Sequence, residues 1–272
     1  MIKQKKEISL AERPIGIFDS GIGGLTVFKE IRKVLPHENL IYLGDTARVP
    51  YGTKSPEVIR QYSEINVRFL IEKGVKVVVV ACNTASAAAI DHLKEHFPDI
   101  VVLGVIAPVV ENLIKLDHVQ KVGIIGTATT IRSGAYQRAI QDKIRVDILV
   151  QACPLFVPLV EEGILDHPLT MQAIDYYLAG IKKAGVDTLI LGCTHYPLLV
   201  RPLDYYFNHR VRIMDSAYYT ARELKKMLAD GRVTNPSRDP GTESFFVTDS
   251  VDTFRHTGEL FLERPLTIIE HV

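Results

Sequence analysis

The amino-acid sequence predicts an α/β fold made of two pseudo-symmetric, doubly wound domains with mainly parallel sheets and an active site in the cleft between them. Three observations support this prediction. Short apolar runs alternate with helical patterns along the whole chain. Most of these runs are unbroken stretches of Val, Ile and Leu, as in strands of a parallel sheet covered on both faces. Two segments of the first half also recur in the second half. Strands that alternate with helices in this way are usually joined by right-handed crossovers.

Nine apolar runs are expected to form strands. In chain order they are Ile15–Phe18, Leu40–Leu43, Val75–Ala81, Val101–Leu103, Val122–Ile125, Asp147–Gln151, Thr188–Leu191, Val211–Met214 and Phe245–Val247.

Start and stop signals define the helices between these strands. Ser55 and Pro56 are typical of an N-cap and a first helical position, and Gly74 follows the end of the same apolar face. A second helical pattern ends before Pro98. A third opens at His167–Pro168 and runs to Gly185. Each helix lies between two expected strands, as a doubly wound fold requires.

An internal echo indicates two halves of common design. The segment 14–21 resembles 121–128, and the segment 77–85, which contains Cys82, resembles 188–196, which contains Cys193. We therefore predict a first domain of residues 1–105 together with 215–272, and a second domain of residues 106–214. The segment after Val211 is expected to return and complete the first sheet.

Bulk properties exclude several classes of protein. The 272 residues carry 32 basic and 32 acidic side chains, so the charge excess of a general nucleic-acid binder is absent. The first residues do not resemble a signal peptide, and the longest apolar stretch, 100–110, is too short to span a membrane. Three widely spaced cysteines do not form a disulfide framework. We expect a cytoplasmic protein with no nucleic-acid or membrane partner.

Two cysteines carry the strongest chemical signal. Cys82 and Cys193 each follow a strand's apolar run and precede a helix, so both lie where open α/β sheets bind ligands. A helix N-terminus favours the thiolate and lowers a thiol pKa towards neutral. If the halves face each other, one thiol removes a proton from a carbon and the other delivers one to the opposite face. Cys153 has no counterpart in the echo and is assigned to the core.

Other interpretations of the cysteines are weaker. Either one alone is a small buried apolar side chain in most proteins. A zinc site needs clustered ligands, and no Cys-x-x-Cys pair or closely spaced set of cysteines and histidines is apparent, so no metal site is expected. A cysteine hydrolase would pair Cys193 with His195 and would leave Cys82 without a role.

Three polar segments accompany the cysteines. The turn Asp19–Gly24 follows the first strand, where its glycines suit either an approaching anion or a tight turn, and Asp19 suits either a supporting carboxylate or an N-cap. A polar loop, 43–52, follows the second strand, and such loops carry function more often than strands do. Glu161 and Glu162 follow an apolar stretch, where paired acids are usually solvated.

On these segments the chain resembles the glutamate racemases of the cofactor-independent aspartate/glutamate racemase superfamily. The matching motifs are Phe18-Asp-Ser-Gly-Ile-Gly-Gly24, Gly44-Asp-Thr-Ala-Arg-Val-Pro-Tyr-Gly52, Ala81-Cys-Asn-Thr-Ala-Ser86, Cys153-Pro-Leu-Phe-Val-Pro-Leu-Val-Glu-Glu-Gly163 and Leu191-Gly-Cys-Thr-His-Tyr-Pro-Leu-Leu199, with Val247-Thr-Asp249 as a further match. Several long motifs in the same order are far more specific than any one of them.

The resemblance implies that Cys82 and Cys193 exchange the proton, with Cys193 acting on L-glutamate. It implies that Asp19 supports Cys82, that His195 supports Cys193, and that Glu161, in preference to Glu162, lies close by. It further implies substrate binding by the pairs Asp19 and Ser20, Tyr51 and Gly52, Asn83 and Thr84, and Thr194 and His195.

The function implied is the interconversion of L- and D-glutamate without a cofactor, which supplies D-glutamate for peptidoglycan. Family members are commonly homodimers, and we expect one here. Two alternatives remain open: an aspartate racemase or related decarboxylase of the same superfamily, and a module that binds an acidic ligand without turning it over. A module of that kind would need neither cysteine.

Overall fold

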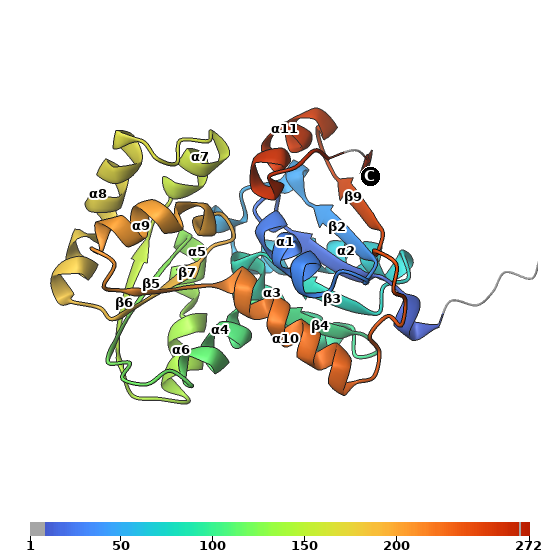
Figure 1. Cartoon of the computed structure of the whole chain (residues 1–272), viewed down its shortest axis with the longest axis horizontal. Helices are drawn as coiled ribbons and strands as arrows, with labels where there is room; N and C mark the ends of the chain where they lie inside the picture. Colours follow the sequence, from blue (N-terminus) through green and yellow to red (C-terminus); the bar gives the residue numbers. More distant parts are fainter. Residues whose placement is uncertain (1–8, 267) are drawn as a thin grey trace, which may run out of the picture.

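The computed structural model describes residues 9–266 and 268–272, which form two sheets in two adjacent lobes (Figure 1). The larger sheet has the strand order β10-β9-β2-β1-β3-β4, and the smaller has the order β6-β5-β7-β8. Every strand pair in both sheets is parallel, which confirms the predicted α/β fold. The strands are β1 (Ile15–Asp19), β2 (Leu40–Gly44), β3 (Val77–Val80), β4 (Val101–Gly104), β5 (Lys121–Gly126), β6 (Asp147–Ala152), β7 (Thr188–Gly192), β8 (Arg212–Asp215), β9 (Glu243–Val247) and β10 (Ile269–His271).

All nine predicted strands are present, within one or two residues at each end. The tenth, β10, was not predicted. It has three residues and pairs with β9 at the edge of the larger sheet. Its last two residues, Glu270 and His271, are exposed, so it carries no buried apolar run that a sequence pattern would detect.

Eleven α-helices cover the sheets within the described residues. They are α1 (Leu25–Val34), α2 (Pro56–Glu72), α3 (Asn83–His96), α4 (Ile106–Leu113), α5 (Ala128–Ser133), α6 (Ala135–Gln141), α7 (Phe156–Glu161), α8 (Pro168–Ala184), α9 (Val200–Tyr206), α10 (Ser216–Asp230) and α11 (Val251–Leu262). None of these described helices is both long and apolar enough to cross a membrane.

The predicted helix signals act as expected. Ser55 caps α2 by accepting a hydrogen bond from the Val58 amide, and Pro56 occupies the first turn. His167 caps α8 in the same way through its side chain, and Gly185 ends that helix with φ of 68°, a left-handed conformation that favours glycine.

Helices lie on both faces of each sheet because neighbouring strand residues point in opposite directions. In the larger sheet, Ile17 packs in the cluster that contains α1 and α10, whereas Phe18 packs in the cluster that contains α2 and α3. In the smaller sheet, Ile125 packs with α7, α8 and α9, and Ile124 packs with α4 and α6.

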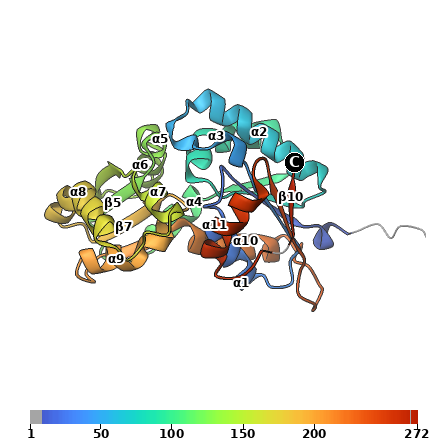
Figure 2. The same ribbon diagram turned by 90° about the horizontal axis from the view of Figure 1, so that it is seen from above.

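The internal echo corresponds to a shared topology. Strands β2-β1-β3-β4 and β6-β5-β7-β8 have the same order, so β1 corresponds to β5 and β3 to β7. After β8 the chain returns to the first lobe, where α10 packs on α1 and β9 joins β2 (Figures 1 and 2). The division of strands between the sheets agrees with the predicted domains, whereas the boundaries at residues 105 and 214 stay a prediction.

Candidate active site

The carboxyl ends of β1, β3, β5 and β7 meet at one cavity of about 360 Å³ between the two lobes. Its lining residues are Ser20, Gly21, Ile22, Val49, Pro50, Tyr51, Gly52, Thr53, Cys82, Asn83, Thr84, Thr127, Ala128, Pro154, Val157, Pro158, Glu161, Cys193, Thr194 and His195. Among the residues that the structure describes, this lining contains no Lys or Arg. An anionic ligand would therefore rely on hydroxyl groups, backbone amides and one imidazole.

Ten of the eleven residues singled out from the sequence line this cavity. The exception is Asp19, which is fully buried and lies behind the lining. Cys82 and Cys193 are each only 5% exposed, and one comes from each lobe. The sulfurs are near enough that negative charge on Cys193 raises the pKa of Cys82. A small ligand in the cavity therefore has a thiol from each lobe beside it.

Cys82 is the N-cap of α3, and its Sγ accepts a hydrogen bond from the Ala85 amide at 3.4 Å. Its Sγ also lies 3.5 Å from the Ser20 hydroxyl. These contacts favour the thiolate, but burial opposes it more strongly. Burial, together with the nearby Asp19 carboxylate, raises the pKa of Cys82 to about 12. The expected lowering of this thiol pKa towards neutral is therefore wrong for Cys82, which is a thiol.

Cys193 has different surroundings. It follows β7 directly, and the next element is the short 3₁₀-helix η4 (Tyr196–Leu199) rather than an α-helix. The prediction of a helix N-terminus beside both thiols is therefore correct only for Cys82. Cys193 has an imidazole instead, because its Sγ lies 3.9 Å from Nδ1 of His195.

Glu161 completes the arrangement around His195. Its Oε1 lies 2.8 Å from Nε2 of His195, so the ring has an acceptor at each nitrogen. Burial lowers the pKa of His195, but the hydrogen bonds to Cys193 and Glu161 outweigh it and raise the pKa to about 10. His195 is therefore an imidazolium near neutral pH. Glu162 does not line the cavity, so the structure places the first of the two acids at the site.

Asp19 forms a different support on the Cys82 side. Its Oδ2 accepts a hydrogen bond from the Gly21 amide at 2.9 Å, and its Oδ1 accepts one from the Thr194 hydroxyl at 3.4 Å. Burial raises the pKa of Asp19, while the charge of His195 and these hydrogen bonds oppose the rise. One thiol thus lies beside a cation and the other near a carboxyl group.

The glycines of the Asp19–Gly24 turn are explained by close packing. A Cβ at Gly23 would lie 2.4 Å from both His195 Nδ1 and Thr194 Oγ1, and a Cβ at Gly24 would lie 2.5 Å from Asp19 Cβ. No real Cβ contact is that short. This turn therefore lets the two lobes approach each other at the site.

The side chains of Asn83 and Tyr51, both predicted to bind substrate, are engaged in hydrogen bonds behind the cavity wall. The Tyr136 hydroxyl donates to Asn83 Oδ1 at 2.6 Å, and Asn83 Nδ2 donates to Ser216 Oγ at 3.1 Å. The Tyr51 hydroxyl donates to Asp45 Oδ2. Asn83 is the first residue of α3, so what it offers a ligand is a backbone amide at a helix N-terminus, a good partner for a carboxylate.

Thr127 is a lining residue that sequence reasoning missed. Its hydroxyl lies 2.9 Å from the Thr84 hydroxyl of the other lobe and 2.9 Å from that of Thr130. The signal that would have found it is the internal echo, because Thr127 occupies the position that corresponds to Ser20. The hydroxyl cluster joins the lobes at the cavity wall.

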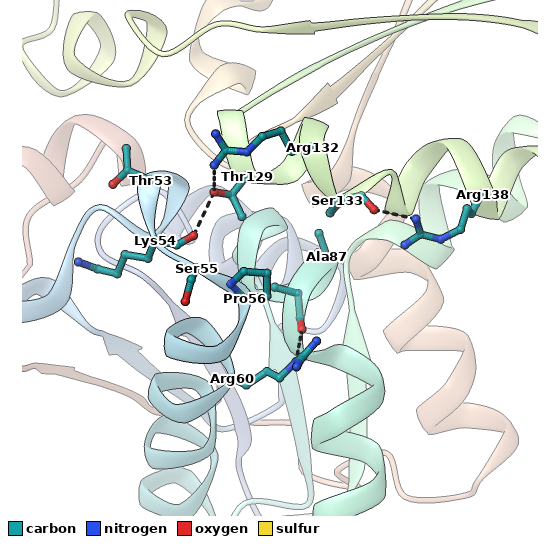
Figure 3. Close-up of a pocket in the computed structure, with 11 residues that line it drawn as sticks. Thr53, Lys54, Ser55, Pro56, Arg60, Ala87, Thr129, Arg132, Ser133 and Arg138 are labelled. Atoms are coloured by element: carbon teal, nitrogen blue, oxygen red, sulfur yellow. Dashed lines mark hydrogen bonds between the residues drawn. The ribbon is translucent and has the colours of Figure 1, made fainter.

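A second cavity, of about 500 Å³, lies beside the first and contains none of the predicted residues (Figure 3). The two cavities share Thr53 in their linings. Thr129 of the second cavity donates its hydroxyl hydrogen to O of Gly52 at 2.8 Å and accepts a hydrogen bond from Arg132. Among the described residues, its lining contains no cysteine, histidine or carboxylate, whereas the smaller cavity has all three.

Residues 22–224 match the family model described as Asp/Glu/Hydantoin racemase. The chain belongs to the Asp/Glu racemase family. Within it, the chain is 48% identical over 251 residues to a glutamate racemase from Geobacter metallireducens, covering 92% of this chain and 93% of that relative.

Solved racemase structures agree with this assignment. The fold matches glutamate racemase from Francisella tularensis in complex with D-glutamate, with a TM-score of 0.90 and 36% identity over 96% of this chain and 98% of the other. It also matches a glutamate racemase isoform from Bacillus anthracis with a TM-score of 0.92 and 38% identity, at the same coverage. The likeness spans both lobes, so it includes the cavity between them.

Proposed function

We propose that this racemase-family chain interconverts L- and D-glutamate by two-base proton transfer between Cys82 and Cys193, without a cofactor. The observation that carries the proposal is the cavity between the lobes, which has one thiol from each lobe in its wall. Inverting a stereocentre requires a base on one face and an acid on the other. Two groups of the same type let the reaction run in both directions.

The surroundings of the thiols support a division of roles. The imidazolium of His195 lies next to Cys193, with 3.9 Å between its Nδ1 and the sulfur, so it is placed to pair with a thiolate during proton transfer. Burial and Asp19 raise the pKa of Cys82, which keeps it protonated. With Cys193 as a thiolate and Cys82 as a thiol, Cys193 is the base that removes the α-proton of L-glutamate, and Cys82 is the acid that delivers a proton to the other face. Transfer in the opposite direction returns both groups to their starting states.

The substrate carboxylates would be held by neutral donors. The amides that begin α3 and the hydroxyls of Ser20, Thr84 and Thr194 are in or beside the wall. A cavity closed to bulk water strengthens such contacts and helps to stabilise the carbanion formed at the α-carbon. We assign substrate binding to these groups together with Tyr51, Gly52 and Asn83.

Three further statements rest on the resemblance to glutamate racemases. We propose that the protein acts as a homodimer, that it works in the cytoplasm, and that its product D-glutamate is used in peptidoglycan.

The proposal is tested by running the reaction in heavy water with the parent protein and the variants Cys82→Ala and Cys193→Ala. Inversion is measured as the appearance of the other enantiomer, and exchange as deuterium at the α-carbon. Each substitution should slow inversion by at least about 100-fold, the usual contribution of an acid–base group. Cys82→Ala still retains Cys193, so it can exchange the α-proton of L-glutamate without forming D-glutamate.

Cys153→Ala is the matched control, because Cys153 is buried in the core and does not line the cavity. It should racemise glutamate like the parent. Aspartate assayed in parallel separates the aspartate alternative, and a module that only binds would show no deuterium uptake. Normal formation of D-glutamate by Cys82→Ala would disprove the two-base scheme.

A further inference from the structure

Glu64, His92 and His96 form a cluster on the surface of the first lobe, away from the cavity. Glu64 lies on α2 and both histidines lie on α3, and these two helices pack side by side (Figure 2). One ligating atom from each residue lies within 4.8 Å of the others. The cluster comes from two separate helices, so the fold rather than the local sequence brings it together.

We propose that these three residues bind a divalent transition-metal ion, with Zn²⁺ as the best match. Two histidines four residues apart lie on one face of a helix and can bind one metal ion together. Imidazole and carboxylate are both ordinary zinc ligands, and three protein ligands leave the fourth tetrahedral position for water. The prediction of no metal site rested on the lack of a Cys-x-x-Cys pair or a closely spaced set of cysteines and histidines in the sequence, and this proposal departs from it.

The hydrogen bonds around the cluster suit metal binding. His96 Nδ1 lies 3.0 Å from the backbone oxygen of His92, which directs the Nδ1 proton there and leaves Nε2 for a metal. His92 Nε2 lies 2.5 Å from Glu64 Oε1, so the proton that these two atoms now share occupies the position that a metal ion would take between them. Arg68 lies 3.5 Å from the other carboxylate oxygen and would orient it from behind.

The ligating atoms need only a small adjustment. Ligand atoms around tetrahedral zinc are about 3.3 Å apart, given bonds of about 2.0 Å. The spread of 4.8 Å closes by rotation of His96, which is exposed and whose ring stacks on that of His92 with the centroids 3.9 Å apart. The pair of His92 Nε2 and Glu64 Oε1, now 2.5 Å apart, would open to about 3.3 Å as the ion replaces the proton between them. His92 and Glu64 are about three-quarters buried, with side chains 25% and 24% exposed, so they form a fixed part of the site.

The position of the cluster assigns the metal a structural role. His92 is ten residues beyond Cys82 on α3, about 15 Å along the helix, which is too far for contact with the substrate. Cys82 caps α3, and α2 begins after the Tyr51–Thr53 turn that lines the cavity. A metal ion would therefore cross-link α2 and α3, the two helices whose N-terminal ends lie beside the active site.

The experiment titrates Zn²⁺ into the full chain by calorimetry and follows thermal unfolding with and without the ion. The variants are His96→Ala and Glu64→Gln. His256→Ala is the matched control, because His256 is likewise exposed on a helix, α11. The parent and the control should bind the ion and unfold at a higher temperature with it, whereas each test variant should bind at least about tenfold more weakly.

Co²⁺ distinguishes binding at this site from binding by a cysteine, because thiolates are also ordinary zinc ligands. Nitrogen and oxygen ligands give only visible d–d bands, whereas thiolate ligands add intense near-ultraviolet charge-transfer bands. The proposal expects visible bands that disappear in His96→Ala and in Glu64→Gln. It is overturned if both variants bind Zn²⁺ within twofold of the parent, or if all bound Co²⁺ shows thiolate bands. Neither result would bear on racemisation, which is measured separately.

Discussion

Gly23 of the first lobe packs directly against Thr194 and His195 of the second lobe, and Gly23→Ala tests whether that close approach is needed. An added Cβ would lie 2.4 Å from His195 Nδ1 and from Thr194 Oγ1, about 1 Å inside the 3.4 Å at which ordinary contacts begin. Neither neighbour can move away cheaply. Glu161 holds His195 by a hydrogen bond, and Asp19 holds Thr194 in the same way. His195 and Thr194 are themselves almost fully buried.

The size of the effect follows from that overlap. Relieving it requires a shift of about 1 Å between Gly23 and the segment that carries Cys193 and His195. Overpacking of this kind costs about 1–3 kcal/mol of the free energy of unfolding. A misplacement of about 1 Å at reacting groups slows an enzyme by about 100-fold, equivalent to about 2.7 kcal/mol in the activation free energy. We expect kcat to fall by about that factor.

The assay measures D-glutamate formation and urea unfolding for Gly23→Ala beside Gly180→Ala. Gly180 is an exposed position within α8, and a Cβ there would meet no atom within 4 Å. Alanine at Gly180 should stabilise the protein by about 0.5–1 kcal/mol and leave kcat unchanged. The reasoning is refuted if Gly23→Ala keeps the parent's kcat and stability, because the lobes would then not be in contact through this turn.

Three further predictions concern pH and stability. The pKa of His195 is about 10 in the fold against 6.5 for an ordinary histidine, so its protonation stabilises the fold fully below pH 6.5, and the stabilisation is lost as pH rises towards 10. The free energy of unfolding should fall over this range more steeply for the parent than for His195→Asn, and parallel curves would contradict this. Asn83→Ala removes the acceptor of the buried Tyr136 hydroxyl and should lower the free energy of unfolding in urea by about 1–3 kcal/mol. The same substitution should cost less when Tyr136→Phe has already removed the hydroxyl, and equal costs in the two backgrounds would argue against the hydrogen bond. The Lys76 ammonium lies 2.6 Å from the buried carboxylate of Glu38. Lys76→Met removes this cation and should lower the free energy of unfolding by about 3–5 kcal/mol, and a loss under about 1 kcal/mol would show that the ion pair is dispensable.

The secondary structure was readable because its signals are local. Unbroken apolar runs mark strands covered on both faces, and Ser55–Pro56 and His167–Pro168 mark helix starts that the structure confirms. The edge strand β10 escaped prediction because it is short and mostly exposed. The structure corrects two local predictions at the site. The short 3₁₀-helix η4, and not an α-helix, follows Cys193, and burial, which is a tertiary effect, outweighs the helix N-terminus at Cys82.

By itself, the sequence determined the fold class, the order of the elements and the placement of two thiols just after corresponding strands. These follow from runs of a few residues, whose conformational preferences do not depend on distant parts of the chain. Only the tertiary structure decided which side chains converge. In it, Glu161 forms a hydrogen bond with His195, the hydroxyls of Thr84 and Thr127 meet across the lobes, and the side chain of Asn83 accepts a hydrogen bond from Tyr136. Such contacts depend on how two lobes pack, and no local pattern in the chain records that packing.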